Sequence, residues 1–310
     1  MIYFVNAKIN LGLDIVGRRP DGYHLLETAF YPIGVHNGTP ANPEPFGDVL
    51  ELTPGLRPEA GYVAGGAGFI FTGRRVDCQP EKNLIVKAVN AIMNDYSDDE
   101  RLRVGEYTLI LDKHIPDGAG LGGGSADATF TLRAVNDYAC GRGVRRRSDA
   151  ELERLALGLG ADCPVFVRNV PAYAEGIGER LEPIGEILKG CWAVTVKPDL
   201  HISTREAFSG VTPARPSTPL RSLLRLPLAE WRGRVRNAFE DSLFPLYPEL
   251  EAIKEAIYGT GAAYASLTGS GAALYGIYGD ADAARAAYAS LADTVEEKVK
   301  LRPAVNLSAL

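Results

Sequence analysis

The sequence has few cysteines, no apolar run of membrane length and no excess of positive charge. Its four cysteines, at positions 78, 140, 163 and 191, lie too far apart for a zinc or redox motif, which predicts reduced thiols in a cytoplasmic protein. Asn6 and Lys8 interrupt the N-terminal segment before an apolar stretch of signal-peptide length, and no later stretch could span a membrane. The formal net charge of -6 argues against a general nucleic-acid binder, which needs a basic face. We therefore expect a cytoplasmic protein that binds neither membranes nor nucleic acids and holds any anionic ligand in a local site.

The length of 310 residues exceeds the size at which a single hydrophobic core usually stops growing, so two domains are expected. From Phe4 to Ile15 apolar and polar residues alternate, which predicts a half-buried strand. Further strands are expected at 26–35, 49–52, 107–111, 192–196, 265–268, 272–278 and near 299. Helical spacing predicts helices at 83–96, 125–141 and 149–158 and in an alanine-rich segment near the C-terminus, so the fold class is expected to be α+β.

The most informative segment is rich in glycine and lies between the predicted strand at 107–111 and the helix that opens near Ser125. Five of the seven residues from Gly118 to Gly124 are glycines, whose backbone can approach a phosphate closely, and the Ser125 hydroxyl can reach a phosphate or its magnesium ion. A flexible linker is the ordinary alternative, but linkers are seldom bounded by a strand and a helix. The expected phosphate-binding loop consists of Pro116, Asp117, Gly118, Ala119, Gly120, Leu121, Gly122, Gly123, Gly124, Ser125 and Ala126.

Three known nucleotide-binding patterns do not account for this loop. Gly118, Gly120 and Gly123 fit the G-x-G-x-x-G pattern of a dinucleotide fold, but the basic residues after Gly141 form no second strand ending in an acid. No Gly-Lys-Ser or Gly-Lys-Thr closes the loop as in a nucleotide P-loop. The sequence also has neither the His-Arg-Asp nor the Asp-Phe-Gly motif of protein kinases.

Three motifs resemble those of the kinase superfamily named after galactose, homoserine, mevalonate and phosphomevalonate, the GHMP kinases. They are NAKINL at 6–11, the glycine loop, and LTGSGAA at 267–273. Other segments narrow the resemblance to members that phosphorylate a cytidine-diphosphate-linked methylerythritol. These are GRRPDGYH at 17–24, GADCPVF at 160–166, AEGIGE at 174–179 and RNAFED at 236–241. Ala126 and Ala272 depart from the serine and the proline that are usual there.

The resemblance implies the two-lobed GHMP kinase fold. The N-terminal, ATP-binding domain is expected to span residues 1–165 and to be similar to ribosomal protein S5 domain 2. The C-terminal domain is expected to span residues 166–310 and to be ferredoxin-like. The implied reaction transfers the γ-phosphoryl group of ATP to the 2-hydroxyl of the methylerythritol moiety, with ATP and Mg2+ as cofactors.

The resemblance also assigns roles to individual residues. It makes Lys8 a cation beside the accepting hydroxyl and Asp162 the base that takes its proton. Without the resemblance, a strand lysine whose head reaches water and an aspartate that caps a turn are the ordinary explanations of these two residues. Ser125 is expected to contact magnesium through the phosphates, and Asn83 and Lys113 are expected to border the adenine.

The substrate contacts that the resemblance implies come from three parts of the chain: Asn10, Tyr23, His24, Thr204, Phe208, Gly269, Ser270 and Gly271. Tyr23 would stack on the cytosine, His24 would bind its edge, and Phe208 would cover the opposite face, although a core position is nearly as strong an alternative for Phe208. Stacking of an aromatic ring on a base contributes about 1 to 3 kcal/mol and needs no basic groove.

Two other functions remain open at this stage. A sister kinase acting on mevalonate, homoserine or a sugar would keep the same loop, but the segment with Tyr23 and His24 argues against it. A catalytically silent nucleotide-binding regulator is disfavoured because both Lys8 and Asp162 are present. ADP release with each acceptor offered separately would distinguish these functions.

Overall fold

A computed structural model of the chain describes residues 1–34, 47–76, 78–294 and 299–306, without the side chains of residues 292–306. These residues form two compact units. Unit 1 lies within residues 1–7, 47–117 and 122–169, and unit 2 lies within residues 8–46, 118–121 and 170–310. The chain therefore passes between the units several times, and the glycine loop itself contributes to both. The domain ranges 1–165 and 166–310 stay a prediction.

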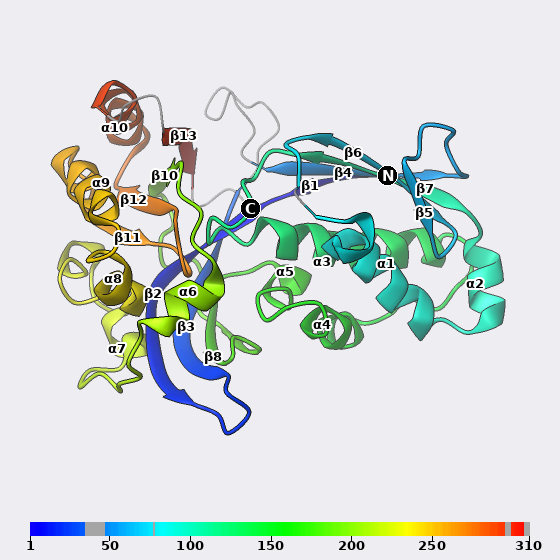
Figure 1. Ribbon diagram of the computed structural model, residues 1–310, viewed down its shortest axis with the longest axis horizontal. Coiled ribbons are helices and arrows are strands. Elements are labelled where there is room, and N and C mark those ends of the chain that lie inside the picture. The colour runs from blue at the N-terminus through cyan, green and yellow to red at the C-terminus, as the bar shows by residue number, and fades with distance from the viewer. Residues whose placement is uncertain (35–46, 77, 295–298, 307–310) are drawn as a thin grey trace. The chain divides into compact units, whose positions relative to one another are not determined.

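Unit 1 is built on a five-stranded mixed sheet with the order β1-β4-β7-β6-β5. Its strands are β1 (Ile2–Val5), β4 (Asp48–Pro54), β5 (Tyr62–Ala64), β6 (Ala67–Gly73) and β7 (Tyr107–Lys113). Its helices are η1 (Pro80–Lys82), α1 (Leu84–Asp95), α2 (Asp98–Val104), α3 (Gly123–Cys140), α4 (Asp149–Leu157) and α5 (Val165–Arg168). Helix α3 packs against α1 and against β1 and β4, so it is the central helix of this unit (Figure 1).

Three helices of unit 1, α1, α2 and α4, begin at residues that satisfy free N–H groups of the first turn. The Asn83 side chain accepts from the N–H of Ile85 and caps α1. Ser97 and Ser148 form capping boxes with Glu100 and Glu151 at the starts of α2 and α4. Short-range signals therefore fix where these three helices begin.

Unit 2 contains two four-stranded sheets, with the orders β2-β3-β8-β9 and β11-β12-β10-β13. The first consists of β2 (Ala7–Arg18), β3 (His24–Ile33), β8 (Ala172–Gly176) and β9 (Arg180–Pro183). The second, in which all pairs are antiparallel, consists of β10 (Trp192–Pro198), β11 (Tyr264–Leu267), β12 (Leu274–Tyr278) and β13 (Val299–Asn306). The helices are α6 (Thr204–Ser209), α7 (Leu220–Leu223), η2 (Leu228–Glu230), α8 (Ala238–Leu243), α9 (Pro248–Gly259) and α10 (Ala281–Thr294).

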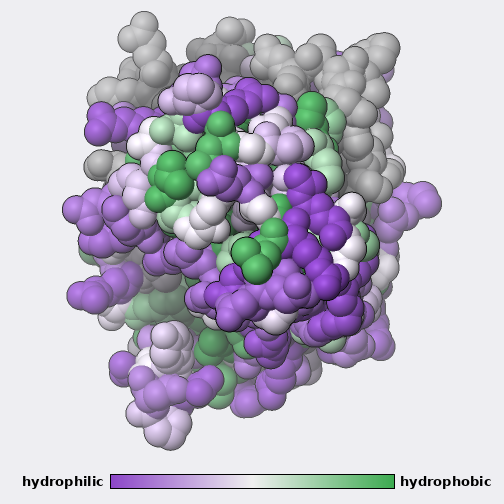
Figure 2. Space-filling model, turned by 90° about the vertical axis from the view of Figure 1, so that its right-hand side faces the viewer, coloured by the Kyte–Doolittle hydropathy of each residue, from purple (hydrophilic) through white to green (hydrophobic). Residues whose placement is uncertain are grey.

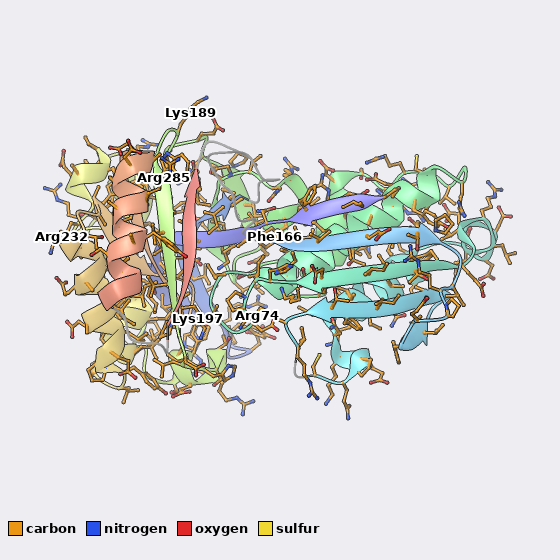
Figure 3. The ribbon with its side chains drawn as sticks, turned by 90° about the horizontal axis from the view of Figure 1, so that it is seen from above. Arg74, Phe166, Lys189, Lys197, Arg232 and Arg285 are labelled. Carbon is orange, nitrogen blue, oxygen red and sulfur yellow. The ribbon has the colours of Figure 1, made fainter. Side chains whose placement is uncertain are left out.

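The core of unit 2 lies between the second sheet and its helices. Helices α9 and α10 pack on this sheet, and buried side chains such as Val194, Leu250 and Ile257 fill the space between them (Figure 1). In the view from above, α10 runs alongside β10 and β13, and the guanidinium carbon of Arg285 is 5.8 Å from the ring centroid of Trp192 (Figure 3). The resulting α+β arrangement confirms the expected fold class.

The first strand differs from the prediction in two ways. The segment from Phe4 to Ile15 belongs to two strands in different sheets, β1 and β2, which are separated at Asn6. The polar side of β2 does not face water, since Lys8 is only 1% exposed and Asn10 only 2%. The alternation is real, but other polar groups cover the second face, so the half-buried interpretation was wrong.

Several elements had no clear signal in the sequence. Helix α2 and strands β5 and β6 were not predicted, and Val35, which we had included in the second strand, lies outside the described residues. The end of unit 1 that carries α2 faces the viewer in Figure 2, where hydrophilic residues surround small, separate hydrophobic groups. Within the described part of the chain, no helix has the length and apolar character that crossing a membrane requires.

Candidate active site

The glycine loop between β7 and α3 has an unusual backbone. Gly118, Gly120 and Gly122 have φ angles of 60°, 75° and 71°, so every second residue is left-handed. Such alternation turns successive N–H groups toward one side and creates a concave surface that binds anions. Residues with a side chain rarely adopt these angles, which explains the repeated glycines.

The first turn of α3 forms the end of the glycine loop and belongs to unit 1. The helix begins at Gly123 with no acidic residue in its first turn and no side chain capping it, so the N–H groups of the first turn carry the positive end of the helix dipole. A Cβ atom at Gly123 would lie 2.7 Å from Ile115 and 2.9 Å from the Lys113 ammonium, so a larger residue there would have to displace these side chains. Ser125 lies in this first turn. A phosphate is the ligand that such a helix start binds most readily.

Lys8 is held beside the glycine loop inside unit 2. Its ammonium donates to the side-chain oxygen of Asn10 over 2.6 Å and to the carbonyl oxygen of Gly120 over 3.0 Å. The same nitrogen lies 5.2 Å from the ring centroid of Phe30, a distance at which a cation is attracted to an aromatic face. The ordinary explanation of a strand lysine, that its ammonium reaches water, therefore does not apply to Lys8.

Asn10 is fixed by contacts on both sides of its amide. Its Nδ2 donates to the Thr28 hydroxyl over 3.0 Å, and its backbone N–H donates to the Thr268 hydroxyl over 3.2 Å. The Thr268 hydroxyl in turn donates to the carbonyl oxygen of Gly120 over 3.0 Å. Because Thr28 takes the amide nitrogen, the Asn10 oxygen is left pointing at Lys8.

The turn between β11 and β12 completes this cluster. Gly269 and Gly271 have φ angles of 54° and 85°. A Cβ atom at Gly269 would lie 3.2 Å from the Cα of Gly120 and 3.5 Å from the Asn10 oxygen, so the two glycine turns are in close contact. Within unit 2 the structure thus brings together residues from all three predicted motifs: Lys8 and Asn10, Gly120, and the turn from Thr268 to Gly271.

Asp162 lies in unit 1, half exposed, in the turn that follows α4. Its neighbour Cys163 is tied to the start of α3, because the Thr129 hydroxyl lies 2.9 Å from the carbonyl oxygens of both Ser125 and Cys163. The Thr129 side chain therefore contacts both the turn that carries Asp162 and the backbone of Ser125. Lys8 belongs to the other unit, so the approach of Asp162 to Lys8 stays a prediction.

The cysteine beside Asp162 is not a nucleophile. Cys163 is fully buried, and this burial raises the pKa of its thiol to about 12. A thiol with such a pKa is almost entirely protonated at neutral pH, and it is the thiolate that reacts. Cys163 is a free thiol, as the scattered positions of the cysteines predict.

Two of the residues expected to bind the base lie side by side in unit 2. His24, at the start of β3, and Phe208, in α6, are stacked with their ring centroids 4.6 Å apart. Phe208 also meets Phe239 edge to face at 4.9 Å, so its ring is partly a core contact. Tyr23 is 62% exposed and Thr204 is exposed at the start of α6. Burial, with a smaller contribution from the positive charge of Arg18, lowers the pKa of His24 and so favours the neutral imidazole.

Lys113 has a local role that the sequence did not reveal. It is 2% exposed, and its ammonium donates to Asp48 and lies 2.9 Å from the carboxylate of Asp127. Burial alone would lower the pKa of Lys113, but the charges of Asp127 and Asp48 outweigh this effect and raise it. Asn83 is the cap of α1. Contacts of Asn83 and Lys113 with adenine stay predictions.

Thr28 and Thr268 are the site residues that sequence reasoning missed. Thr268 lies inside the third motif, directly before the glycine turn, but only the glycines were singled out. Thr28 interrupts the apolar residues of β3, and such a buried hydroxyl needs a partner. The signal was present, but only the fold shows that its partner is Asn10.

Comparison with known proteins identifies the family of this chain. The sequence matches the GHMP kinases N terminal domain over residues 83–169 and the GHMP kinases C terminal domain over residues 221–297. Together with the fold, these matches define a kinase of the GHMP class. The matched ranges contain the glycine loop in the first case and the turn from Thr268 to Gly271 in the second.

Individual relatives narrow the class. The chain is 45% identical to a 4-diphosphocytidyl-2-C-methyl-D-erythritol kinase of Parabacteroides distasonis and 42% identical to one of Bacteroides fragilis, covering 90% of this chain and 92% of each relative. A crystal structure of a 4-(cytidine 5'-diphospho)-2C-methyl-D-erythritol kinase superimposes with a TM-score of 0.73 at 30% identity and covers 99% of both chains. The chain therefore belongs to the 4-diphosphocytidyl-2-C-methyl-D-erythritol kinase family.

Proposed function

We propose that this protein transfers the γ-phosphoryl group of ATP to the 2-hydroxyl of 4-diphosphocytidyl-2-C-methyl-D-erythritol. The products are the 2-phosphate and ADP, and the reaction belongs to the non-mevalonate pathway of isoprenoid synthesis in the cytoplasm. The observation that carries the proposal is the cluster of Lys8, Asn10, Gly120 and Thr268, which joins the three kinase motifs through hydrogen bonds. The names of the relatives support the choice of acceptor.

ATP would be bound by the glycine loop. The left-handed glycines and the free N–H groups at the start of α3 suit a chain of phosphates, and their charge complements the negative charge that spreads over a transferring phosphoryl group. Pro116, Asp117, Ala119, Leu121, Gly124 and Ala126 complete this loop as backbone contacts. Adenine would lie near Asn83 and Lys113.

Magnesium would be bound mainly through the phosphates of ATP. Among the residues that the structure describes, no group of three or more His, Cys, Asp or Glu side chains could hold a metal ion. Mg2+ is usually bound through substrate phosphates and few protein ligands, and Ser125 at the start of α3 offers one hydroxyl. Magnesium would neutralise phosphate charge, and the remaining chemistry falls to the side chains.

Lys8 and Asp162 would act on the accepting hydroxyl. Asp162 would take its proton as the oxygen attacks phosphorus, a contribution of roughly 10² to 10⁴ in rate for a positioned base. Lys8, held by Asn10 and Gly120, would keep a positive charge at the place where the alkoxide develops. Asn10, Gly269, Ser270 and Gly271 would contact the acceptor from the same side as Lys8.

The cytosine would be recognised by the segment after β2. A neutral His24 can both donate and accept a hydrogen bond, which suits the edge of an uncharged base. Tyr23, with its exposed ring, would stack on the base, and Phe208 and Thr204 from α6 would border it. The stacking of His24 on Phe208 places an aromatic pair at this position.

A first experiment tests the acceptor. Purified protein, ATP and Mg2+ are mixed separately with the cytidylated methylerythritol, mevalonate, homoserine and galactose, and ADP release is followed. We expect fast turnover with the first acceptor only. Faster turnover of another acceptor would identify a sister kinase, and ATP binding without any turnover would identify a silent regulator.

A second experiment tests the base. We expect the Asp162→Asn variant to lose roughly 10² to 10⁴ in kcat while its affinity for ATP, measured by calorimetry, stays close to that of the unaltered protein. Asp98→Asn is the control, because the Asp98 side chain is 96% exposed in α2. Near-normal turnover of the Asp162→Asn variant would exclude this residue as the base.

A further inference from the structure

The segment RNAFED at 236–241 resembles a family signature, but none of the roles above uses it. In the structure it forms the start of α8, which lies next to β11 in unit 2 (Figure 1). Two of its polar side chains are buried: Asn237 is 1% exposed and Glu240 is 8% exposed. Burial of polar groups is costly unless each one is hydrogen-bonded, so their partners indicate what they hold.

Asn237 uses every polar atom of its side chain. Its Oδ1 accepts from the N–H of Phe239 over 3.0 Å and caps α8. Its Nδ2 donates to the carbonyl oxygens of Leu267 over 2.9 Å and of Gly269 over 2.8 Å. Because carbonyl oxygens only accept, these contacts also fix which end of the amide is nitrogen. Asn237 therefore bonds to the residues before and after Thr268.

Glu240 holds the end of β11 from the same helix. Its Oε1 accepts from the N–H of Leu267 over 2.9 Å and from the Ser266 hydroxyl over 3.1 Å. Its Oε2 accepts from Lys254 over 2.6 Å, which balances its charge. Both backbone groups of Leu267, the last residue of β11, are thus bound by side chains at the start of α8: its N–H by Glu240 and its carbonyl oxygen by Asn237.

The held turn is the one that touches the Lys8 cluster. Thr268 donates to Gly120 and accepts from the backbone of Asn10, and Gly269 packs directly against Gly120. A shift of Thr268 would release the carbonyl oxygen of Gly120, which is also a partner of Lys8. The chain of contacts therefore runs from Asn237 through the turn to the ammonium of Lys8.

We propose that Asn237 is a positioning residue for phosphoryl transfer. It holds the backbone of Leu267 and Gly269 in place, so that the Thr268 hydroxyl keeps its bonds to Gly120 and Asn10 and thereby fixes the position of the Lys8 ammonium. Glu240 supports the same backbone from its other side. This role rests on the proposed function, since it concerns the same reaction. Asn237 itself needs no contact with either substrate.

The test is the Asn237→Asp variant, which has the same shape. It keeps the oxygen that caps α8 but places an acceptor against two carbonyl oxygens, so the turn must move. The matched control is Asn136→Asp, because Asn136 is also 1% exposed and holds the backbone of Arg147 with two bonds of 2.9 Å in unit 1. Both variants should lose stability, which controls for the general effect of a buried charge.

The two variants should differ in activity. We expect Asn237→Asp to lower kcat about tenfold to a hundredfold at saturating ATP and acceptor, since a displacement of about 1 Å in a reacting group can cost a hundredfold. Its KM for ATP should change less than kcat, because the hydrogen-bond partners of Asn237 lie outside the glycine loop. Asn136→Asp should keep kcat within about twofold per folded molecule. Equal kcat values for the two variants would overturn the proposal.

A double-mutant cycle identifies the route. If Asn237 acts through the Thr268 hydroxyl, Thr268→Val should reproduce the loss in kcat, and the double variant should be no worse than the single ones. Multiplied losses would show that the two residues act separately and would refute the route. Should Asn237→Asp fail to fold, Asn237→Ser replaces it, since serine also caps a helix but cannot reach the two carbonyl oxygens.

Amide hydrogen exchange gives a readout that does not depend on the acceptor. The N–H groups of Thr268 and Gly271 are bonded inside the turn, to Ala273 and Thr268. Their exchange should be faster in the Asn237→Asp variant, and its rate should be unchanged in the Asn136→Asp variant. Unchanged exchange in the turn would refute the positioning role, whereas faster exchange in a protein that prefers another acceptor would refute only the assigned substrate.

Discussion

Replacement of Gly120 by alanine tests the contact between the glycine loop and the turn after β11. The φ angle of 75° already disfavours alanine, at a cost of about 1 to 2 kcal/mol for a left-handed residue. The new Cβ would also lie 2.8 Å from the carbonyl carbon of Thr268 and closer still to its oxygen. Both atoms are backbone, so no side-chain rotation can relieve the clash and one of the two turns must move.

The magnitude follows from the bonds that this movement breaks. The carbonyl oxygen of Gly120 accepts from the Lys8 ammonium and from the Thr268 hydroxyl. A hydrogen bond to a charged group contributes about 1.5 to 3 kcal/mol and a neutral one about 1 kcal/mol. We therefore expect Gly120→Ala to lower the free energy of unfolding by about 2 to 4 kcal/mol in addition to the backbone cost. We also expect kcat to fall about a hundredfold, because Lys8 is displaced.

Gly233 provides the matched control. Its φ angle is also 75°, but a Cβ atom there would meet nothing within 4 Å. Gly233→Ala should therefore show the backbone cost alone, with unchanged kcat. Urea unfolding measures the stability difference between the two variants, and ADP release measures their activity. If Gly120→Ala unfolds at the same urea concentration as Gly233→Ala and keeps its kcat, the close contact with Thr268 does not exist in solution.

Two further predictions concern buried charges. Lys113→Met leaves the carboxylates of Asp48 and Asp127 facing each other without a cation, so the free energy of unfolding should fall by roughly 3 to 5 kcal/mol. The loss should be smaller at pH 5 than at pH 8. The additional substitution Asp127→Asn should restore part of the lost stability. A denaturant titration with no loss would contradict the triad. Burial raises the pKa of Asp14 from 3.8 to about 6, and the charge of Arg236 has a smaller, opposite effect. Between these two pH values the native state keeps a proton that the unfolded state releases, so the free energy of unfolding falls as pH rises. Asp14→Asn should remove this slope and be about 1 to 3 kcal/mol more stable at pH 8, whereas an unchanged slope would show that Asp14 titrates normally.

Local signals predicted much of the fold. The helix expected at 83–96 is α1 (Leu84–Asp95), bounded by its cap Asn83, and the hairpin around the third motif is β11 and β12. The helix after the glycine loop begins at Gly123 rather than Ser125, and it ends before Gly141 as expected. Helix α2 was missed because it has only seven residues, among which Val104 alone is buried. An apolar face of one residue gives no periodicity to detect.

The site was predicted less completely, because its residues act through partners distant in sequence. Motif order selected Lys8, Asn10 and the two glycine turns, which the structure brings into contact within unit 2, but it did not reveal the bond from Thr28 that orients Asn10. Lys113 was expected at the adenine, whereas the structure shows its ammonium engaged with Asp48 and Asp127. Residue type states what a side chain can do, and only the fold states which partner reaches it.

The first strand shows why sequence alone misjudged the environment of the site. A period of two residues identifies two faces of a strand but not what covers each of them. Along β2 the polar face carries Lys8 and Asn10, both buried, and it is covered by the glycine loop and the turn at Thr268. A polar face that is buried must be satisfied by hydrogen bonds, and the partners here are backbone carbonyls and hydroxyls at fixed positions. The same burial that a hydropathy pattern cannot detect holds the Lys8 ammonium in place, and the proposed role of Lys8 requires a fixed cation that stabilises a developing alkoxide at little cost of reorganisation.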